Sequence, residues 1–355
     1  MQITPELRAQ LDEQKKQCIY CKIVSKEMQG KTVFEDKKTE AVLDIYPPVK
    51  GHVVYLLKEH YPLIPYIPED EFKHFVGLVP QLCKCIQKGM VSLGINVFIA
   101  SGGAAGQQLP HFLMHILPRE EGDGFFNFMF NRNAILNQEK KDLFAHNFPI
   151  MMGNHFNRSP AKWHQGAGET PDFLKDIYEK NTVIYEDEKL VCVIPEKGAV
   201  EGHLEIYSKV EEFKISKLSI NDSFHLFSTA SLASTLVFEG LGAQGTNIII
   251  KSGKSDDNPQ GKLVVHVLPR FFDDSLKGMH WPQKQASYNL DNIQSRIKEH
   301  AWQIKYVEEP EELSKEMPKE VTKIDIVKEV DSAPVKKKSS GNEIKDAIER
   351  LRYGD

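Results

Sequence analysis

Hydrophobic and polar residues follow a regular order along the first third of the chain. Short alternating or β-branched runs predict five strands, near residues 31–36, 40–46, 51–57, 95–101 and 111–117. Between the third and the fourth strand, residues 68–94 begin with acidic side chains and continue with apolar residues at helical spacing. This segment predicts a helix that Pro80 can kink. The order favours an α+β fold in which a helix covers an antiparallel sheet.

The same pattern recurs at an offset of 151 residues. The segment from Gly51 to Arg119 matches the segment from Gly202 to Arg270 without a net gap. The matched residues include His52 and His203, Asn96 and Asn247, Gly102 and Gly253, and His115 and His266. A constant offset over such a length predicts two tandem copies of one small domain, called copy one and copy two below.

Changes in composition divide the chain further. We expect an N-terminal helix (1–17), copy one (18–125), a connecting segment with a helix near 133–145 (126–170), copy two (171–306) and a charged tail (307–355). The tail is poor in aromatic residues and interrupted by Pro and Ser, which is typical of disorder. Its end predicts a short amphipathic helix that either frays, docks on its own domain or binds a protein partner.

Composition and charge restrict the class of protein. The chain has 355 residues, of which 41% are hydrophobic and 27% are charged, as is usual for a soluble globular protein. A formal net charge of −5 gives no general attraction to nucleic acid or anionic membranes. No apolar stretch reaches the roughly 18 residues of a membrane span. The five cysteines are unevenly placed and do not suggest a disulfide framework, so we expect a cytoplasmic protein without membrane contact.

Four residues of copy one form a candidate zinc site. Cys18 and Cys21 have a spacing that lets two thiolates chelate one ion, although a redox pair or chance also produces it. His60 and His111 would complete a tetrahedral set of two cysteines and two histidines. With four protein ligands no position stays open, so the zinc would be structural.

Copy two provides an internal control for this site. Glu211 and Lys262 stand at the positions of the two histidines, and no cysteine occurs between residues 155 and 191. Residues that hold one ion are expected to be lost together. The sequence therefore predicts one zinc ion per chain, in copy one.

Copy one resembles the histidine-triad (HIT) superfamily over nearly all of its length. The last strand of that superfamily carries three alternating histidines, and here it reads Pro110-His111-Phe112-Leu113-Met114-His115-Ile116-Leu117-Pro118-Arg119. The upstream matches are Cys18 with Cys21, Leu43-Asp44-Ile45, Gly51-His52, Lys58-Glu59-His60 and Ala105-Gly106-Gln107. Copy two matches more weakly, through Gly202-His203 and His266 to Arg270.

The resemblance implies a five-stranded antiparallel sheet with helices in each copy. Two such domains usually pair into one continuous sheet, so the tandem copies should form an intramolecular pseudo-dimer in a monomeric chain. The resemblance also implies that zinc is held by the set already named, Cys18, Cys21, His60 and His111. Asp44 would contact ribose, whereas its counterpart in copy two is Pro195.

The middle residue of the triad departs from the superfamily pattern. Members transfer or hydrolyse nucleoside phosphates through a covalent phosphoramidate on the middle histidine, but here the residue is Leu113, and Val264 in copy two. Neither side chain has a lone pair for attack. His115 lies about 6.6 Å further along the same face, whereas near-attack geometry requires about 3–3.5 Å. We therefore predict a catalytically degenerate protein.

The remainder of the presumed nucleotide site is partly retained. Gly102, Gly106 and Gln107 predict either a loop with free N–H groups that bind an anion or a plain turn. His52 and His115 are candidate ligand contacts, and His52 could instead make a buried structural hydrogen bond. Position 100, where members often have Asn, is Ala.

Two further pairs of residues recur in both copies. His74 and His225 lie on the predicted helices, and we expect them at the surface or at a cap. Arg119 and Arg270 end the last strands, where structural salt bridges are expected.

Three hypotheses for function remain. The first is a zinc-stabilised protein in which copy one binds a purine nucleotide or another phosphate compound without covalent catalysis. The second is a nucleoside-phosphate hydrolase or transferase that uses water, with His115 or His52 as general base. The third is an adaptor that docks on a protein or RNA complex through the pseudo-dimer surface and the charged tail.

Overall fold

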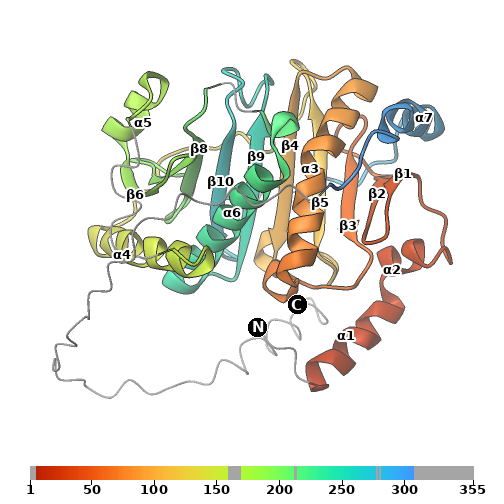
Figure 1. The fold of residues 1–355 in the computed structure, drawn as a ribbon, viewed down its shortest axis with the longest axis horizontal. Helices are drawn as coiled ribbons and strands as arrows, with labels where there is room; N and C mark the ends of the chain where they lie inside the picture. The colour runs from red at the N-terminus through yellow and green to blue at the C-terminus, as the bar shows by residue number, and fades with distance from the viewer. Residues whose placement is uncertain (1–4, 159–168, 212–213, 277–278, 280, 308–355) are drawn as a thin grey trace. The chain divides into compact units, whose positions relative to one another are not determined.

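The computed structural model describes residues 5–158, 169–211, 214–276, 279 and 281–307 (Figure 1). They belong to one compact unit that ends at Val307. The expected N-terminal helix runs over Pro5–Gln17 (α1) and is followed by the short helix Ile19–Val24 (α2). The predicted disorder of the tail and its terminal helix lie outside the described residues. Among the described helices, none is long and apolar enough to cross a membrane.

Ten strands form one antiparallel sheet, five from each copy (Figure 1). Copy one supplies β1 (Thr32–Glu35), β2 (Thr39–Leu43), β3 (Val53–Leu57), β4 (Gly94–Ser101) and β5 (Leu113–Arg119). Copy two supplies β6 (Thr182–Glu186), β7 (Leu190–Ile194), β8 (Leu204–Ser208), β9 (Gly245–Ser252) and β10 (Val264–Arg270). The strand order is β1-β2-β3-β5-β4-β9-β10-β8-β7-β6. The expected α+β fold and the pseudo-dimer are both confirmed.

The two copies meet where β4 pairs with β9. Phe98 lies opposite Ile249, which is its own counterpart at the offset of 151 residues. Asn96 lies opposite Lys251, and Ala100 lies opposite Asn247, so the register is symmetric about that central pair. A surface that pairs with its own equivalent is the mark of a two-fold interface. The fused chain therefore reproduces within itself the interface of a symmetric dimer.

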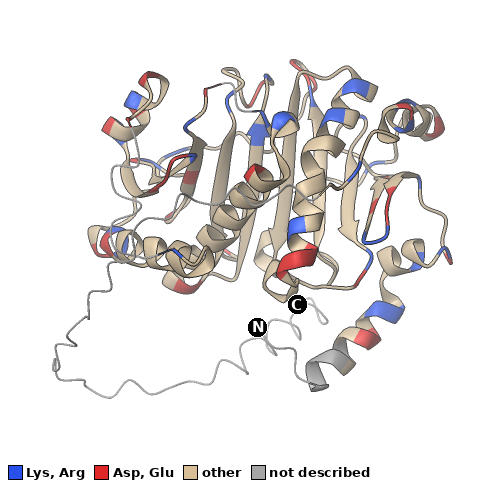
Figure 2. Ribbon diagram, in the orientation of Figure 1, with Lys and Arg blue, Asp and Glu red and all other residues tan. Residues whose placement is uncertain are grey.

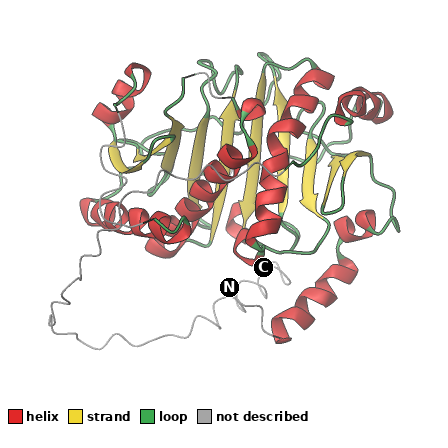
Figure 3. Ribbon diagram, viewed as in Figure 1, coloured by secondary structure: helices red, strands yellow, loops and turns green. Residues whose placement is uncertain are grey.

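Two long helices lie side by side on one face of the sheet (Figure 3). They are α3 (Glu69–Met90) in copy one and α6 (Ile220–Leu241) in copy two. Acidic residues begin α3 and Lys88 lies in its last turn, which suits the helix dipole (Figure 2). Pro80 does not end α3, because the buried apolar face on both sides of it packs in the main core. The helix was expected to reach residue 94 but stops at Met90, where Val91 adopts a left-handed conformation.

The segment after each copy crosses to the other copy. Helix α4 (Gln138–His155), which follows copy one, packs on α6 and β6 of copy two. Helix α7 (Leu290–Ala301), which follows copy two, packs on α3 and β1 of copy one. The two copies therefore exchange their C-terminal helices.

The boundaries of α4 differ from the expected helix near 133–145. The helix begins after Asn137, whose side chain accepts a hydrogen bond from Lys140 N, and it continues to His155. It passes through Pro149 because Phe148 and Met152 are fully buried on either side. Short helices complete the described fold: Ile64–Tyr66, Gly103–Ala105, Asp172–Leu174, Ile215–Lys217 and α5 (Lys175–Lys180).

Candidate zinc site and paired histidines

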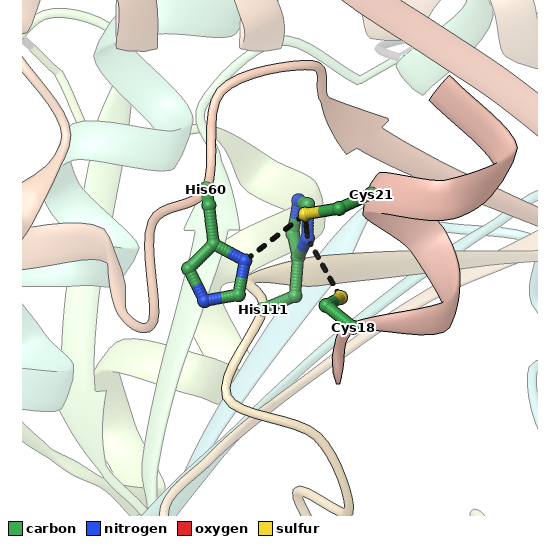
Figure 4. A group of neighbouring side chains, drawn as sticks. All are labelled: Cys18, Cys21, His60 and His111. Carbon is green, nitrogen blue, oxygen red and sulfur yellow. Dashed lines mark hydrogen bonds between the residues drawn. The ribbon is translucent and has the colours of Figure 1, made fainter. Parts of the chain in front are cut away.

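The four predicted zinc ligands come together from three separate segments (Figure 4). Cys18 precedes α2 and Cys21 lies within it. His60 lies in the loop after β3, and His111 lies just before β5. All four side chains are buried. A polar cluster of this kind inside apolar surroundings requires compensation, which a metal ion would supply.

The distances within the cluster fit a tetrahedral zinc site. His111 Nδ1 lies 3.4 Å from Cys18 Sγ and 3.6 Å from Cys21 Sγ. His60 Nδ1 lies 3.2 Å from Cys21 Sγ. Zinc–sulfur and zinc–nitrogen bonds of about 2.3 and 2.0 Å at tetrahedral angles give an S···N edge of about 3.5 Å. The residues present therefore fit the ion.

Neighbouring groups orient the ligands. Leu57 O lies 3.0 Å from His111 Nε2 and accepts its hydrogen, which directs Nδ1 toward the two sulfurs. A hydrogen bond from the Cys21 thiol holds the pKa of Cys18 well below its usual range, with His111 and His60 acting in the same direction. The pKa of Cys21 is raised by that same hydrogen bond and by burial. Both sulfurs would bind zinc as thiolates.

Strand β5 carries Leu113 and His115 on the face of the sheet opposite the long helices. Met114 and Ile116 point to the core beneath α3, so their neighbours in the strand point the other way. Leu113 packs against the buried residues Val42, Val54 and Leu56, and Tyr20, Ile23 and Val24 of α2 pack against the same cluster. The middle triad position is therefore part of an apolar cluster that α2 covers.

His115 and His52 form a hydrogen-bonded pair on this face. His52 Nε2 lies 3.0 Å from His115 Nδ1, and His52 is completely buried. Asp44 Oδ2 lies 3.4 Å from His52 Nδ1. Burial lowers the pKa of each histidine to about 3, so both are neutral at pH 7. The buried hydrogen bond that was one interpretation of His52 is thus present.

The glycine loop differs from the expected anion cradle. The N–H of Gly102 donates to Gln107 Oε1, and the N–H groups of Gly106 and Gln107 donate to carbonyls within the loop. Gln107 Nε2 donates to Pro62 O and Leu109 O. Of the two interpretations of this loop, free N–H groups that bind an anion or a plain turn, the structure favours the turn, because the loop satisfies these N–H groups internally.

Comparison with known proteins gives the family. The HIT domain model matches residues 25–122. An uncharacterised HIT-like protein of Methanocaldococcus jannaschii is 39% identical over 107 residues, which cover 30% of this chain and 82% of that protein. The chain belongs to the HIT family.

Of two other proteins that are similar to this chain, one has a named activity and the other was solved with bound zinc. The adenosine 5′-monophosphoramidase of Candida albicans is 30% identical over 108 residues, which cover 29% of this chain and 71% of that enzyme. A solved zinc-bound histidine triad family protein from Mycobacterium smegmatis is 27% identical, with a TM-score of 0.30, and the match covers 31% of this chain and 80% of that one.

Copy two replaces the zinc cluster with other contacts. Lys262, at the position of His111, donates to Phe173 O and lies over the Phe173 ring. The ammonium group at this position is thus satisfied by protein atoms. Glu211, at the position of His60, is exposed.

Copy two has a buried carboxylate beside its histidine pair. Glu205 stands where copy one has Val54, and it forms an ion pair of 2.6 Å with Arg132. Its Oε1 also lies 3.2 Å from His266 Nδ1, and its Oε2 accepts from the Tyr207 hydroxyl. Glu205, His203 and His266 lie close enough to share a metal ion, but the contact with Arg132 already neutralises the carboxylate. Glu205 was not among the predicted site residues, although a carboxylate in a predicted buried strand was a usable signal.

The segment after the last strand of each copy places an aromatic ring over the histidine pair of the other copy. Trp281 packs against His52 and His115, with ring centroids 5.6 and 5.7 Å away. Phe130, the counterpart of Trp281 at the offset of 151 residues, packs against His203 and His266. Both rings follow the last strand of their own copy, so this contact is a second exchange between the copies.

The structure contradicts the expectation for one of the two further recurring pairs, the helix histidines, and agrees with the expectation for the other, the arginines. His74 and His225 are neither surface nor cap residues: each Nε2 lies 2.6 Å from a carboxylate oxygen, of Asp36 or Asp187. These contacts fasten each helix to the turn that follows the first strand of its copy. Arg119 forms the expected salt bridges, with Asp123 and with Asp257 of copy two. Arg270 pairs with Asp274 in the equivalent way.

Proposed function

We propose that this HIT protein is held together in copy one by a structural zinc ion and binds a purine nucleotide or a related phosphate compound there without forming a covalent intermediate. Cys18, Cys21, His60 and His111 would hold the ion. Zinc bound by four protein ligands stabilises the fold and leaves no position for substrate. Copy two would serve mainly as a structural partner.

The observation that carries the non-covalent part is the position of Leu113. Its side chain takes the place of the nucleophile on β5 and packs against the apolar cluster of Val42, Val54 and Leu56. An aliphatic group offers neither a lone pair nor a proton, so it cannot form a phosphoramidate. Asp44, His52 and His115 remain beside it as polar groups for a ligand.

Support for a nucleotide comes from the family. The Candida albicans relative is named for activity on an adenosine 5′-monophosphate derivative. Adenosine 5′-monophosphate is therefore the first probe, with binding followed by titration calorimetry. We expect one binding site per chain, weakened at least tenfold in Asp44→Ala. Heat changes that do not saturate, or that are the same in Asp44→Ala, would contradict a pocket in copy one.

A gain-of-function variant tests the missing nucleophile. Leu113→His should form a covalent adenylate with adenosine 5′-phosphoramidate, visible in the intact mass, whereas the native chain should not. Val264→His is the matched control in copy two, where Glu205 and Arg132 occupy the neighbourhood, and it should stay unmodified. Turnover by the native chain would overturn the proposal. A folded, zinc-loaded Leu113→His protein without adduct would show that more than the nucleophile has been lost.

The second candidate function is hydrolysis by water with His115 or His52 as general base. The 3.0 Å contact between these two histidines, backed by Asp44, favours it. Hydrolysis of the phosphoramidate by the native chain, lost in His115→Ala, would select this function. The adaptor hypothesis depends on the tail and stays a prediction.

A further inference from the structure

Both copies contain a pair of imidazoles on neighbouring strands, but the pairs have different outer partners. In copy two, His203 Nε2 lies 3.1 Å from His266 Nδ1, close to the 3.0 Å found in copy one. A neutral imidazole has one nitrogen that donates and one that accepts. The group that contacts Nδ1 of the first histidine therefore sets the direction of the hydrogen bond between the two rings.

The direction in copy two is set by a backbone amide. The N–H of Ala199 donates to His203 Nδ1 over 3.1 Å. An amide N–H can only donate, so this nitrogen carries the lone pair and Nε2 carries the hydrogen. His203 then donates to His266 Nδ1. Glu205 Oε1 lies 3.2 Å from the same nitrogen and would favour a hydrogen there, but its ion pair of 2.6 Å with Arg132 weakens this effect. The amide donor therefore decides the direction, and the hydrogen of His266 is left on its outer nitrogen, Nε2.

The same position in copy one is Pro48, which has no N–H. The turn is otherwise retained: His52 N donates to Val49 O over 3.2 Å, and His203 N donates to Val200 O over 3.1 Å. A second substitution accompanies the first, because copy one has Asp44 where copy two has Pro195. A hydrogen-bond donor toward the first histidine has thus been replaced by a carboxylate that lies near the same nitrogen without forming a hydrogen bond to it.

The carboxylate reverses the hydrogen positions in copy one. Asp44 Oδ2, 3.4 Å from His52 Nδ1, favours a hydrogen on that nitrogen and repels a lone pair. His52 Nε2 must then accept from His115 Nδ1. The outer nitrogen of His115, Nε2, is left with its lone pair, and it has no hydrogen-bond partner within the described part of the chain.

We propose that the two histidine relays run in opposite directions, so that His115 Nε2 accepts a hydrogen bond from the ligand of copy one, whereas His266 Nε2 in copy two can only donate. His115 thereby selects a ligand that presents an O–H or N–H group at this position, and it disfavours an unprotonated oxygen there. This role rests on the function proposed above. His266 is buried beneath Phe130, whereas His115 is partly exposed beside Trp281, so copy one is the copy that can use its relay.

The direction of each relay is measurable without any ligand. Long-range proton–nitrogen correlation spectra of the full chain with nitrogen-15-labelled histidine distinguish ring nitrogens that carry hydrogen from those that do not. We expect Nε2 of His115 to lack hydrogen and Nε2 of His266 to carry it. Pro48→Ala/Asp44→Ala should restore the amide donor and move the hydrogen of His115 to Nε2. Ala199→Pro is the matched change in copy two, and it should remove the fixed direction there.

A binding measurement tests the selection. Adenosine 5′-phosphoramidate offers an N–H group, and we expect Pro48→Ala to weaken its binding roughly tenfold, as for a lost hydrogen bond. Identical tautomers in the two copies would overturn the inference even if the nucleotide binds. Opposite tautomers without any nucleotide binding would retain the relay but refute the proposed function and the ligand role with it. Unchanged affinity in a Pro48→Ala chain whose His115 tautomer has switched would refute selection by His115.

Discussion

Copy one and copy two have the same strand order but carry different polar groups at equivalent positions. Copy one surrounds it with two cysteines and two histidines whose spacing suits zinc. Copy two has a lysine at one of those positions, and beside its histidines the buried Glu205 pairs with Arg132, whose side chain is 41% exposed. The comparison shows that the same fold tolerates replacement of a cysteine–histidine cluster when a polar group that takes its place, such as Lys262, finds a partner in the protein.

Zinc removal gives the largest expected difference between the copies. We expect about one zinc per chain, and Cys21→Ser should abolish it and destabilise the fold by more than about 4 kcal/mol, since structural zinc contributes on the order of 10 kcal/mol. Metal analysis and chemical denaturation measure both effects. Lys262→Ser in copy two is the control and should leave the zinc content unchanged. Two zinc ions per chain, or none, would break the assignment.

The Asp–His contacts should differ in strength between the copies. Asp187 is completely buried and accepts from Tyr185, His225 and two backbone amides, whereas the side chain of Asp36 is 25% exposed. Asp187→Ala should therefore cost about 4 kcal/mol and Asp36→Ala about 2 kcal/mol. Urea denaturation compares them. The reverse ranking would mean that burial does not control these contacts.

The paired histidines are shared and should make both copies sensitive to acid. Burial lowers the pKa of His52 and His115 to about 3 and also lowers the pKa of His203 and His266. Their stabilising effect is complete above pH about 6.5, the ordinary pKa of an unfolded histidine, and is lost as the pH falls toward the folded values. Each group contributes up to about 1.4 kcal/mol per pH unit in this range.

We expect His52 and His115 alone to lower the free energy of unfolding by about 3 kcal/mol between pH 7.5 and 5.5, at about 1.4 kcal/mol each. Denaturation with a chelator present separates this effect from zinc release, and hydrogen exchange then reports on the strands of copy two. A free energy that stays flat over this range would show that the folded histidines accept protons freely.

The smallest expected difference in stability between the copies concerns glycine substitutions that face the exchanged helices α7 and α4. A Cβ atom on Gly89 would lie 2.9 Å from Ile297 Cα and 3.0 Å from Arg296 O, both in the backbone of α7. A Cβ atom on Gly240, its counterpart, would instead meet the Phe144 ring of α4 at 2.7 Å. Backbone cannot rotate aside as a side chain can, so Gly89→Ala should cost about 2 kcal/mol and Gly240→Ala less than about 1 kcal/mol. Thermal unfolding of the two variants tests this order.

Much of the fold followed from local patterns. The alternating runs and the helix after residue 68 appeared close to their expected positions, because a half-buried strand or helix must show its period in the sequence. The boundaries of α4 did not, since buried contacts of Phe148 and Met152 carry the helix past Pro149. Tertiary packing decided where that helix ends.

In the candidate site, too, one part was predictable from the sequence and another depended on the tertiary structure. The zinc set was predictable because chelating residues have a characteristic spacing and disappear together from copy two. The hydrogen-bond partners of the Gly102 and Gly106 N–H groups were not predictable, since they depend on how the turn closes.

The sequence by itself determined the repeat, the succession of strands and helix along the chain, the four grouped ligands and the aliphatic residue at the middle of the triad. Only the tertiary structure decided that Trp281 and Phe130 each cover the histidines of the other copy, that Arg132 neutralises Glu205, and that Pro48 faces a ring nitrogen. The physical reason is that periodicity and spacing are properties of neighbouring residues. Contacts between distant segments depend on the path of the whole chain, which no local pattern records.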